Sequence, residues 1–224
     1  MSTLASAAVE DYIRSLYLLE EAEPGAAVTT TRLANRLSVT PASATGMVKR
    51  LAELGLVDHA DYRGARLSAR GRHLALEITR HHRLLEQFLA EVLEVPWDLV
   101  HTEADELEHG LSEELEARIA KRLGDPDRDP HGDPIPTAAL EVSELPTVSL
   151  AELAVGQRGT FVRAFDAEPA MLRYLSESGI HLGDLLEVLE RQPFGGATVV
   201  RCPAGERAIG AELAPHLRVE AEAV

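Results

Sequence analysis

The sequence predicts a mainly helical fold with two small β components, divided into three consecutive segments. Residues 1–73 show a helix–turn–helix–hairpin pattern. Residues 74–146 carry long stretches of helically spaced apolar residues, and residues 147–224 contain short alternating runs separated by glycines. The 224 residues are enough for about two domains, each with its own core.

The first segment begins with three predicted helices. Residues 10–21 have apolar side chains at helical spacing, and residues 29–37 form a shorter second helix with threonines available as N-caps. Thr40 and Pro41 suit the N-cap and first position of a third helix, which runs to a C-terminal stop at Gly55. A tight turn joins the second helix to the third, as in a helix-turn-helix unit.

A short hairpin is expected directly after the third helix. Residues 56–59 and 65–68 predict two strands around a turn at 62–64, which completes a winged helix-turn-helix plan. Residues 28–73 carry eight basic and three acidic side chains, a net charge of +5 within a chain of net charge -15. A basic island in an acidic protein favours contact with DNA phosphates.

The rest of the chain is helical and then β-rich. Residues 72–94 and 98–123 predict two long helices, whereas five prolines interrupt 124–150 and indicate an irregular connection. From residue 148 on, short alternating runs predict a small barrel-like β domain, with one helix at about 169–179. The predicted domains are therefore 1–73, 74–146 with its proline-rich connection at 124–146, and 147–224.

The exposed face of the third helix is the candidate DNA-reading surface. Small hydroxyl side chains near its N-terminus can approach base edges closely, and basic residues further along the helix and in the wing can contact phosphates. The candidate DNA-binding residues are Thr40, Ala42, Ser43, Thr45, Gly46, Lys49, Arg50, Arg63 and Arg66.

Metal-capable side chains recur on one face of the helix expected at 98–123. Two imidazoles and two carboxylates share this face, namely His101, Asp105, Glu108 and His109. A second pair, His82 and Glu86, is one helical turn apart in the preceding helix. This spacing predicts a metal site, although acidic residues on a helix more often just face water.

Other functional classes find less support in the sequence. A metal-dependent hydrolase could use Glu108 or Glu86 as a general base, but no HExxH pair, nucleophile elbow or phosphate-binding glycine loop accompanies them. The apolar runs are too short for a membrane span, and the N-terminus does not resemble a signal peptide. The single cysteine, Cys202, excludes an intramolecular disulfide, and a cytoplasmic setting is expected.

Several long stretches resemble the diphtheria toxin repressor family of metal-dependent regulators, especially its manganese transport regulator branch. The resemblance rests on VEDYIRSLYLLEE, VTPASATGMVKRLAELGLV, RHHRLLEQFL, EADELEHGLSEELEARI and GDPIP, and it covers nearly the whole chain. It implies a winged helix-turn-helix domain, a helical dimerisation and metal-binding domain, and a C-terminal SH3-like domain.

The resemblance also implies two sets of metal ligands. The primary site would consist of Asp11, Asp105, Glu108 and His109. The ancillary site would consist of His82, Glu86 and His101, completed by a side chain of the C-terminal domain, for which Glu168 matches best and Asp166 is the alternative.

Departures from the family pattern favour manganese. The iron-sensing branch has methionine and cysteine where this chain has Asp11 and Asp105, and oxygen ligands suit Mn²⁺ better than sulfur ligands do. Arg14 stands where a short, two-domain form of the manganese regulator has a bridging carboxylate, so that form's closely spaced metal pair is not expected. Met171 replaces a polar residue of the iron branch.

The resemblance therefore implies a Mn²⁺-activated transcriptional regulator, expected to repress metal uptake genes as a homodimer on a palindromic DNA operator. An Fe²⁺-dependent repressor of the same family, or a winged-helix regulator that senses no metal, are the alternatives. Other divalent transition metals are expected to substitute in vitro. Neither a membrane nor a small organic substrate is expected as a partner.

Overall fold

The computed structural model describes residues 6–60, 64–143, 145–165 and 168–222. The chain divides into two compact units. The first unit comprises Met1–His82, Glu108–Glu116 and Pro136–Glu141, and the second comprises Arg83–Leu107, Ala117–Ile135 and Val142–Val224. Over the described ranges, no helix is long and apolar enough to cross a membrane.

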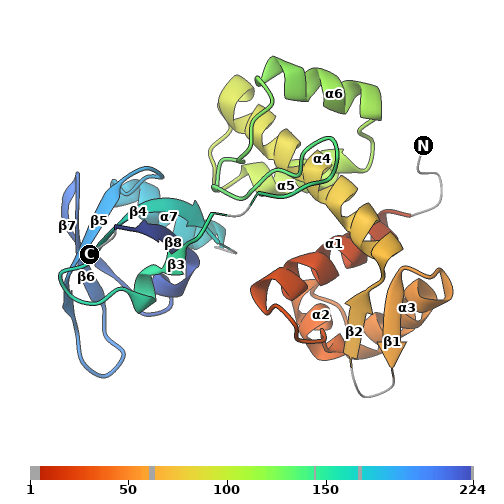
Figure 1. The fold of residues 1–224 in the computed structure, drawn as a ribbon, viewed down its shortest axis with the longest axis horizontal. Helices are drawn as coiled ribbons and strands as arrows, with labels where there is room; N and C mark the ends of the chain where they lie inside the picture. Colours follow the sequence, from red (N-terminus) through yellow and green to blue (C-terminus); the bar gives the residue numbers. More distant parts are fainter. Residues whose placement is uncertain (1–5, 61–63, 144, 166–167, 223–224) are drawn as a thin grey trace. The chain divides into compact units, whose positions relative to one another are not determined.

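The first unit contains the predicted helix-turn-helix and wing (Figure 1). Its elements are α1 (Ala7–Ala22), α2 (Thr30–Arg36), α3 (Pro41–Glu53), β1 (Val57–Ala60) and β2 (Gly64–Leu67). Thr40 caps α3 by accepting a 3.2 Å hydrogen bond from the Ser43 amide, and Pro41 takes the first helical position. These elements agree with the prediction to within a few residues.

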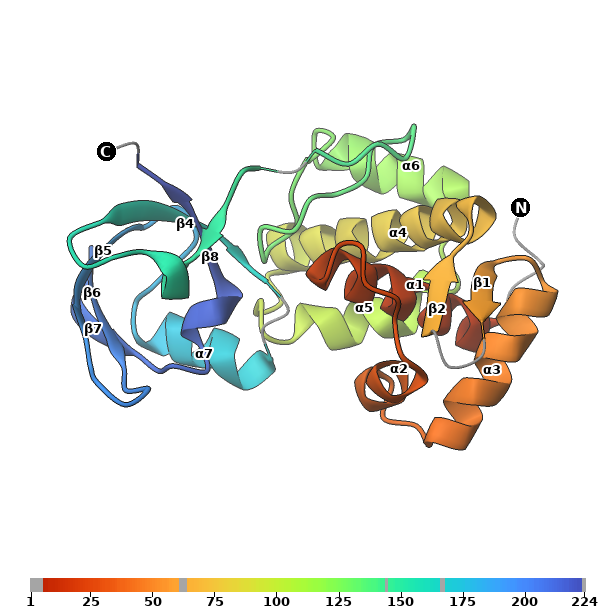
Figure 2. The ribbon, with the colours of Figure 1, turned by 60° about the horizontal axis from the view of Figure 1, so that its bottom comes forward.

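A single apolar core holds these elements together. Ile13 and Leu16 of α1, Leu33 of α2, and Val48 and Leu51 of α3 are fully buried in it. β1 and β2 pair as an antiparallel hairpin, and Figure 2 shows α3 lying beside that hairpin. The core fixes α1 and α3 to one another, so the position of α1 determines where the exposed face of α3 lies.

The helices that follow differ in one respect from the prediction. They are α4 (Ala69–Leu93), α5 (Val100–Glu108) and α6 (Glu113–Arg122). The expectation of one helix over 98–123 was wrong, because α5 ends at Glu108. Gly110 disfavours helix, and the Ser112 hydroxyl accepts a hydrogen bond from the Leu115 amide, which starts a new helix. His109 therefore lies in the turn after α5.

The second unit contains the predicted small β domain, an antiparallel sheet in the order β3-β8-β4-β5-β6-β7. The strands are β3 (Val148–Ser149), β4 (Arg158–Ala164), β5 (Leu185–Arg191), β6 (Thr198–Cys202), β7 (Gly205–Ile209) and β8 (Leu217–Ala221). The helix α7 (Pro169–Glu177) and the 3₁₀ turns Leu150–Glu152 and Ala214–His216 complete it. Phe161, Leu175 and Leu186 are fully buried in its core. This is the SH3-like fold that the resemblance implies.

Part of the proline-rich connection, residues 129–134, packs within the second unit. The Ala164 amide of β4 donates a 2.8 Å hydrogen bond to the His131 carbonyl. Arg83 of α4 donates to the Pro134 carbonyl at 2.5 Å, and Trp97 donates through Nε1 to Ser176 at 2.7 Å. Residues 129–134 thereby contact Arg83 of α4 and strand β4, within the second unit.

Candidate metal centres and DNA-binding surface

The predicted reading face of α3 is exposed. Ala44, Val48 and Leu51 turn into the core, whereas six of the predicted residues face solvent, namely Thr40, Ala42, Ser43, Gly46, Lys49 and Arg50. Thr45 is half-buried, and its hydroxyl donates to the Pro41 carbonyl at 2.8 Å. Arg66 is exposed on β2 and donates to the Gly25 carbonyl. Arg63 lies outside the described residues.

A first cluster of metal-capable groups joins α1 to the end of α5. Ligand atoms of Asp11, Glu108 and His109 all lie within 4.8 Å of one another. His109 Nε2 is 3.3 Å from Asp11 Oδ1, and Glu108 is buried. The structure thus brings three of the four predicted primary-site residues side by side, from positions almost a hundred residues apart.

Glu10 is a member of this cluster that the sequence analysis missed. Its Oε2 lies 2.7 Å from His109 Nδ1. A carboxylate on one imidazole nitrogen leaves the other nitrogen to face a metal ion and orients the ring, a common arrangement in metal sites. The sequence signal available for Glu10 was its position next to Asp11 on α1. Its pairing with His109 spans 99 positions, so no local spacing pattern predicts it.

The electrostatics of His109 reflect this acidic setting. Burial lowers the pKa of His109, but the hydrogen bond with Glu10 and the charges of Glu108, Asp11 and Glu10 outweigh burial, so the pKa is raised above its ordinary value. The cluster therefore favours a positive charge at this point. A divalent cation bound beside His109 would be attracted by the same carboxylates, provided that the imidazole is neutral.

The cluster opens onto a pocket of about 880 Å³ in the first unit. Its lining includes Glu10, Glu108 and His109 together with Glu77 of α4 and Glu113 of α6. An acidic pocket of this size could give a hydrated cation a path to Glu108, which is otherwise buried.

Asp105 lies on α5, three residues before Glu108, and belongs to the second unit. It is half-exposed, and its Oδ2 is 3.6 Å from His101 Nε2 one turn earlier. Asp105 and Glu108 share one face of α5, as their i, i+3 spacing predicts.

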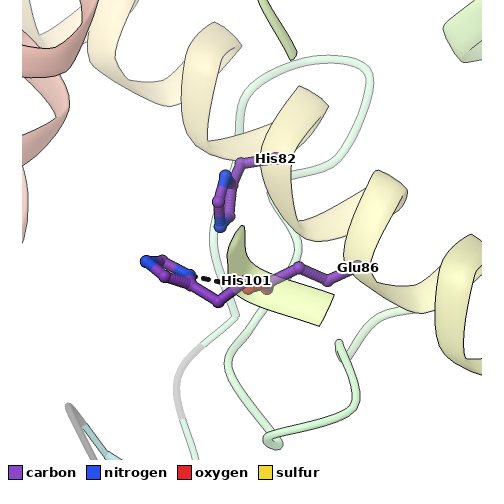
Figure 3. Close-up of side chains that lie close together, drawn as sticks. All are labelled: His82, Glu86 and His101. Atoms are coloured by element: carbon purple, nitrogen blue, oxygen red, sulfur yellow. Dashed lines mark hydrogen bonds and ion pairs between the residues drawn. The ribbon is translucent and has the colours of Figure 1, made fainter. Parts of the chain in front are cut away.

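A second cluster of metal-capable groups lies in the second unit around Glu86. Ligand atoms of Glu86, Asp129 and His131 lie within 4.8 Å of one another, and all three residues are buried. Glu86 Oε1 is also 2.9 Å from His101 Nδ1. Figure 3 draws part of the predicted ancillary site: His82 and Glu86 project from successive turns of α4, and His101 of α5 pairs with Glu86.

Asp129 and His131 were not predicted as site residues. Both lie in the run GDPDRDPHGDPIP, which was interpreted from its prolines as a connection. Burial raises the pKa of Asp129 well above its ordinary value, and the charges of Asp133 and Glu86 raise it further, although Arg83 opposes them. A buried carboxylate beside two others is a place where a bound cation would remove repulsion.

Ligand atoms of the three ancillary residues predicted on α4 and α5, His82, Glu86 and His101, lie within 4.8 Å of one another. His82 Nδ1 is 2.6 Å from Glu108 Oε2, and its Nε2 is 2.8 Å from an Arg14 nitrogen. Glu168 is the exposed N-cap of α7, and in the described part of the chain it joins no ligand group. Met171 packs against the core of the β domain. Asp166 lies outside the described residues.

The donor chemistry of both clusters fits a divalent transition metal. Each offers carboxylate oxygens and at least one imidazole nitrogen, and neither contains sulfur. The one cysteine, Cys202, is buried in the β domain, where its thiol lies 3.2 Å from the Gly205 carbonyl. Geometry and donor type thus agree with the site class predicted from the sequence.

Comparisons with known families cover the chain in three stretches. The domain described as "Iron dependent repressor, N-terminal DNA binding domain" matches residues 5–65, and "Iron dependent repressor, metal binding and dimerisation domain" matches residues 68–137. The FeoA domain matches residues 148–221.

Individual relatives are repressors of the kind that these domain descriptions name. The iron-dependent repressor IdeR of Mycobacterium tuberculosis is 32% identical over 206 residues, covering 85% of this chain and 87% of the relative. The diphtheria toxin repressor of Corynebacterium diphtheriae is 35% identical over 167 residues, 73% of this chain and 68% of the relative. A solved structure of a manganese-dependent transcriptional repressor in complex with manganese is 40% identical, with a TM-score of 0.89 over 96% of this chain and 100% of the other.

Proposed function

Because the chain belongs to the iron-dependent repressor family, which includes the diphtheria toxin repressor, it is a metal-dependent transcriptional repressor, and we propose that Mn²⁺ is the ion to which it responds. Members of this family bind DNA as repressors, and the chain is not an enzyme. Its DNA-binding and dimerisation domains indicate a homodimer that binds DNA.

One observation carries the choice of manganese: the sulfur-free donor sets of both clusters. Asp11, Glu108 and His109 form the core of the proposed primary centre, with Asp105 as its further ligand. Oxygen-rich sites suit Mn²⁺, and thiolate or thioether ligands shift the preference toward later metals. A relative at 40% identity is named as manganese-dependent, which supports the same choice.

Fe²⁺ is the second candidate, because one of the curated relatives, IdeR, is named an iron-dependent repressor. Imidazole and carboxylate also bind Fe²⁺, so the two ions compete for the same atoms. Availability in the cell and the oxygen-to-sulfur ratio of the site then decide which ion acts.

A second metal centre is proposed around Glu86, with Asp129 and His131 as ligands and His101 beside them. This assignment replaces an exposed last ligand, Glu168, with two buried side chains of the connection. His82 is a further proposed ligand of this centre, because its ligand atom lies within 4.8 Å of those of Glu86 and His101. Asp166 lies outside the described residues.

The mechanism follows from what these residues connect. A bound divalent ion supplies positive charge that offsets the clustered carboxylates. Asp11 and Glu10 belong to α1, and α1 packs in the same core as α3. Ligation of Asp11 together with Glu108 and His109 therefore fixes α1, and α3 with it, relative to the end of α5. A metal ion shifts this equilibrium only through tighter binding to the DNA-competent arrangement.

DNA recognition is assigned to the exposed face of α3. We place its N-terminal residues in the major groove and assign Lys49, Arg50, Arg66 and, by sequence, Arg63 to the backbone phosphates. Two such helices in a dimer read two half-sites, so the operator is expected to be palindromic.

The double variant Asp11→Met, Asp105→Cys tests the metal assignment. Sulfur ligands in the primary centre should weaken Mn²⁺ binding and strengthen Fe²⁺ binding, measured anaerobically as dissociation constants by competition with a fluorescent chelator. The matched control, Glu103→Met, Glu106→Cys, alters two exposed positions of α5, the helix that carries Asp105. Unchanged Mn²⁺ and Fe²⁺ constants in the ligand variant would remove these residues from the site.

A further inference from the structure

The loop 129–133 carries two proposed ligands of the second metal centre, Asp129 and His131. Asp129 Oδ1 accepts hydrogen bonds from the backbone amides of His131 at 2.8 Å and Asp133 at 2.9 Å. The Asp129 amide donates to the Asp133 carbonyl at 3.0 Å, and the Gly132 amide donates to the Asp129 carbonyl at 3.0 Å. The loop is therefore a closed turn, and a contact that fixes one of its residues also fixes the two ligands.

The carboxylate of Asp133 pairs with two arginines from different elements of the second unit. Arg83 of α4 places Nη2 3.6 Å from Asp133 Oδ1, and Arg163 of β4 pairs with the same oxygen through its own Nη2. The side chains of Arg163 and Asp133 are only 11% and 17% exposed, so water screens their attraction far less than it screens a surface pair. This ion pair connects the β domain to the loop.

Two further contacts support the position of Arg163. Its guanidinium lies over the ring of Phe165, 4.6 Å from the ring centroid, which restricts where the guanidinium can lie. The next residue of β4, Ala164, donates its amide to the His131 carbonyl at 2.8 Å. Backbone and side chain of β4 therefore hold the same loop, one at His131 and the other at Asp133.

We propose that Arg163 is a positioning residue of the second metal centre, which it serves without being a ligand. Its ion pair with Asp133 fixes the loop, and the fixed loop presents Asp129 and His131 to Glu86. The inference rests on the proposed metal binding at this centre. Orientation of the ligands before the ion arrives lowers the entropic cost of binding, so Arg163 raises metal affinity. By thermodynamic linkage, the bound ion strengthens the contact between the loop and β4.

A second arginine of the β domain provides a matched control for a merely structural role. Arg191 of β5 donates to the carbonyls of Leu150 and Leu153 and to the hydroxyl of Thr198, all within the β domain. Arg191→Ala should therefore destabilise the β domain and leave the loop 129–133 in place. Its free energy of unfolding should fall, but its affinity for metal should not.

The test titrates the full-length protein with Mn²⁺ and follows the electron paramagnetic resonance signal of the free ion. The class of binding site that disappears in Glu86→Gln identifies the second centre. Arg163→Ala should weaken this class about 10-fold, the usual scale for loss of an outer-shell partner, and leave the other class unchanged. Arg163→Lys should recover part of the loss, because it restores a cation near Asp133. In an Asp133→Asn background, Arg163→Ala should have no further effect.

Hydrogen exchange of β4 gives a readout in the wild-type protein. Because the Ala164 amide donates to the His131 carbonyl, its exchange should slow when Mn²⁺ is added. The slowing should be smaller in Arg163→Ala. Exchange that is unchanged by Mn²⁺ in the wild type would contradict the link between the loop and β4.

The outcomes separate this inference from the proposed function. If Glu86→Gln loses no class of site, the second centre itself is refuted. If that class is present and Arg163→Ala binds Mn²⁺ as the wild type does, the positioning role alone is refuted. An equal loss of affinity in Arg191→Ala would likewise show that Arg163 acts only through the stability of the β domain. Circular dichroism identifies a variant that fails to fold, and the wild-type exchange measurement then decides.

Discussion

The connection that carries Asp129 and His131 contains a glycine, Gly132, that has no room for a side chain. Its φ is +84°, and a Cβ built there would lie 2.0 Å from the Val162 carbonyl oxygen and 2.9 Å from the Arg163 Cα. Both obstacles are backbone atoms of β4, so neither can rotate away. Gly132→Ala should therefore push the connection off the β domain.

The cost can be worked from these contacts. A left-handed backbone costs a non-glycine residue about 1–2 kcal/mol. Relief of the 2.0 Å contact requires the strand and connection to separate by about 1 Å, which breaks the hydrogen bond from the Ala164 amide to the His131 carbonyl, worth about 0.5–1.5 kcal/mol. With the lost packing added, Gly132→Ala should lower the free energy of unfolding by about 3–5 kcal/mol.

Gly156 provides a matched control in the same unit. Its φ is +86°, but a Cβ there would meet no atom within 4 Å. Gly156→Ala therefore carries the backbone strain alone and should cost about 1–2 kcal/mol. The difference between the two variants isolates the close approach of the connection to β4.

The assay is urea unfolding followed by the fluorescence of Trp97, the one tryptophan in the sequence. Trp97 is well placed because its ring stacks on His131 at a centroid distance of 6.0 Å and its Nε1 donates to Ser176. Equal losses of stability in Gly132→Ala and Gly156→Ala would refute the reasoning. So would unchanged Trp97 emission in folded Gly132→Ala.

Two further predictions concern charge. The hydrogen bond with His81, and then the hydrogen bond and charge of Arg80, hold the pKa of Glu116 below its ordinary value despite burial. The stabilising effect of Glu116 is therefore present above the pKa of the unfolded chain and is lost as the pH falls through the lower pKa of the folded protein, so Glu116→Gln should flatten the acid limb of a stability–pH curve and Glu103→Gln should not. Lys49→Ala should lower the slope of log affinity for DNA against log salt by about 1 if Lys49 contacts a phosphate, whereas Lys121→Ala should leave the slope unchanged.

The N-terminal elements were predictable because their signals are local. Thr40 and Pro41 mark the start of α3, Gly55 marks its end, and apolar spacing identifies the buried face. The same local reasoning failed at 109–112, where acidic residues with good helix propensity on both sides obscured the break. Gly110 and the cap at Ser112 were the signals that outweighed them.

Long-range pairing explains what the sequence could not show. The ligand groups on α4 and α5 have helical spacing, and so they were found. Asp129 and His131 lie in an irregular connection, where spacing carries no information about facing residues, and their proximity to Glu86 appears only after folding. Glu10 pairs with His109 across 99 positions, and Arg14 reaches His82 across 68.

The most direct test of the central claim is metal-dependent DNA binding by the purified full-length protein. Fluorescence anisotropy on DNA from upstream of its own gene and of a manganese transporter would be compared in chelator, in Mn²⁺ and, anaerobically, in Fe²⁺. Ionic strength is held constant because phosphate contacts make affinity salt-dependent. The account predicts specific binding that requires metal and appears with Mn²⁺ at concentrations where Fe²⁺ has little effect. Tight specific binding in chelator, unchanged by either ion, would contradict it.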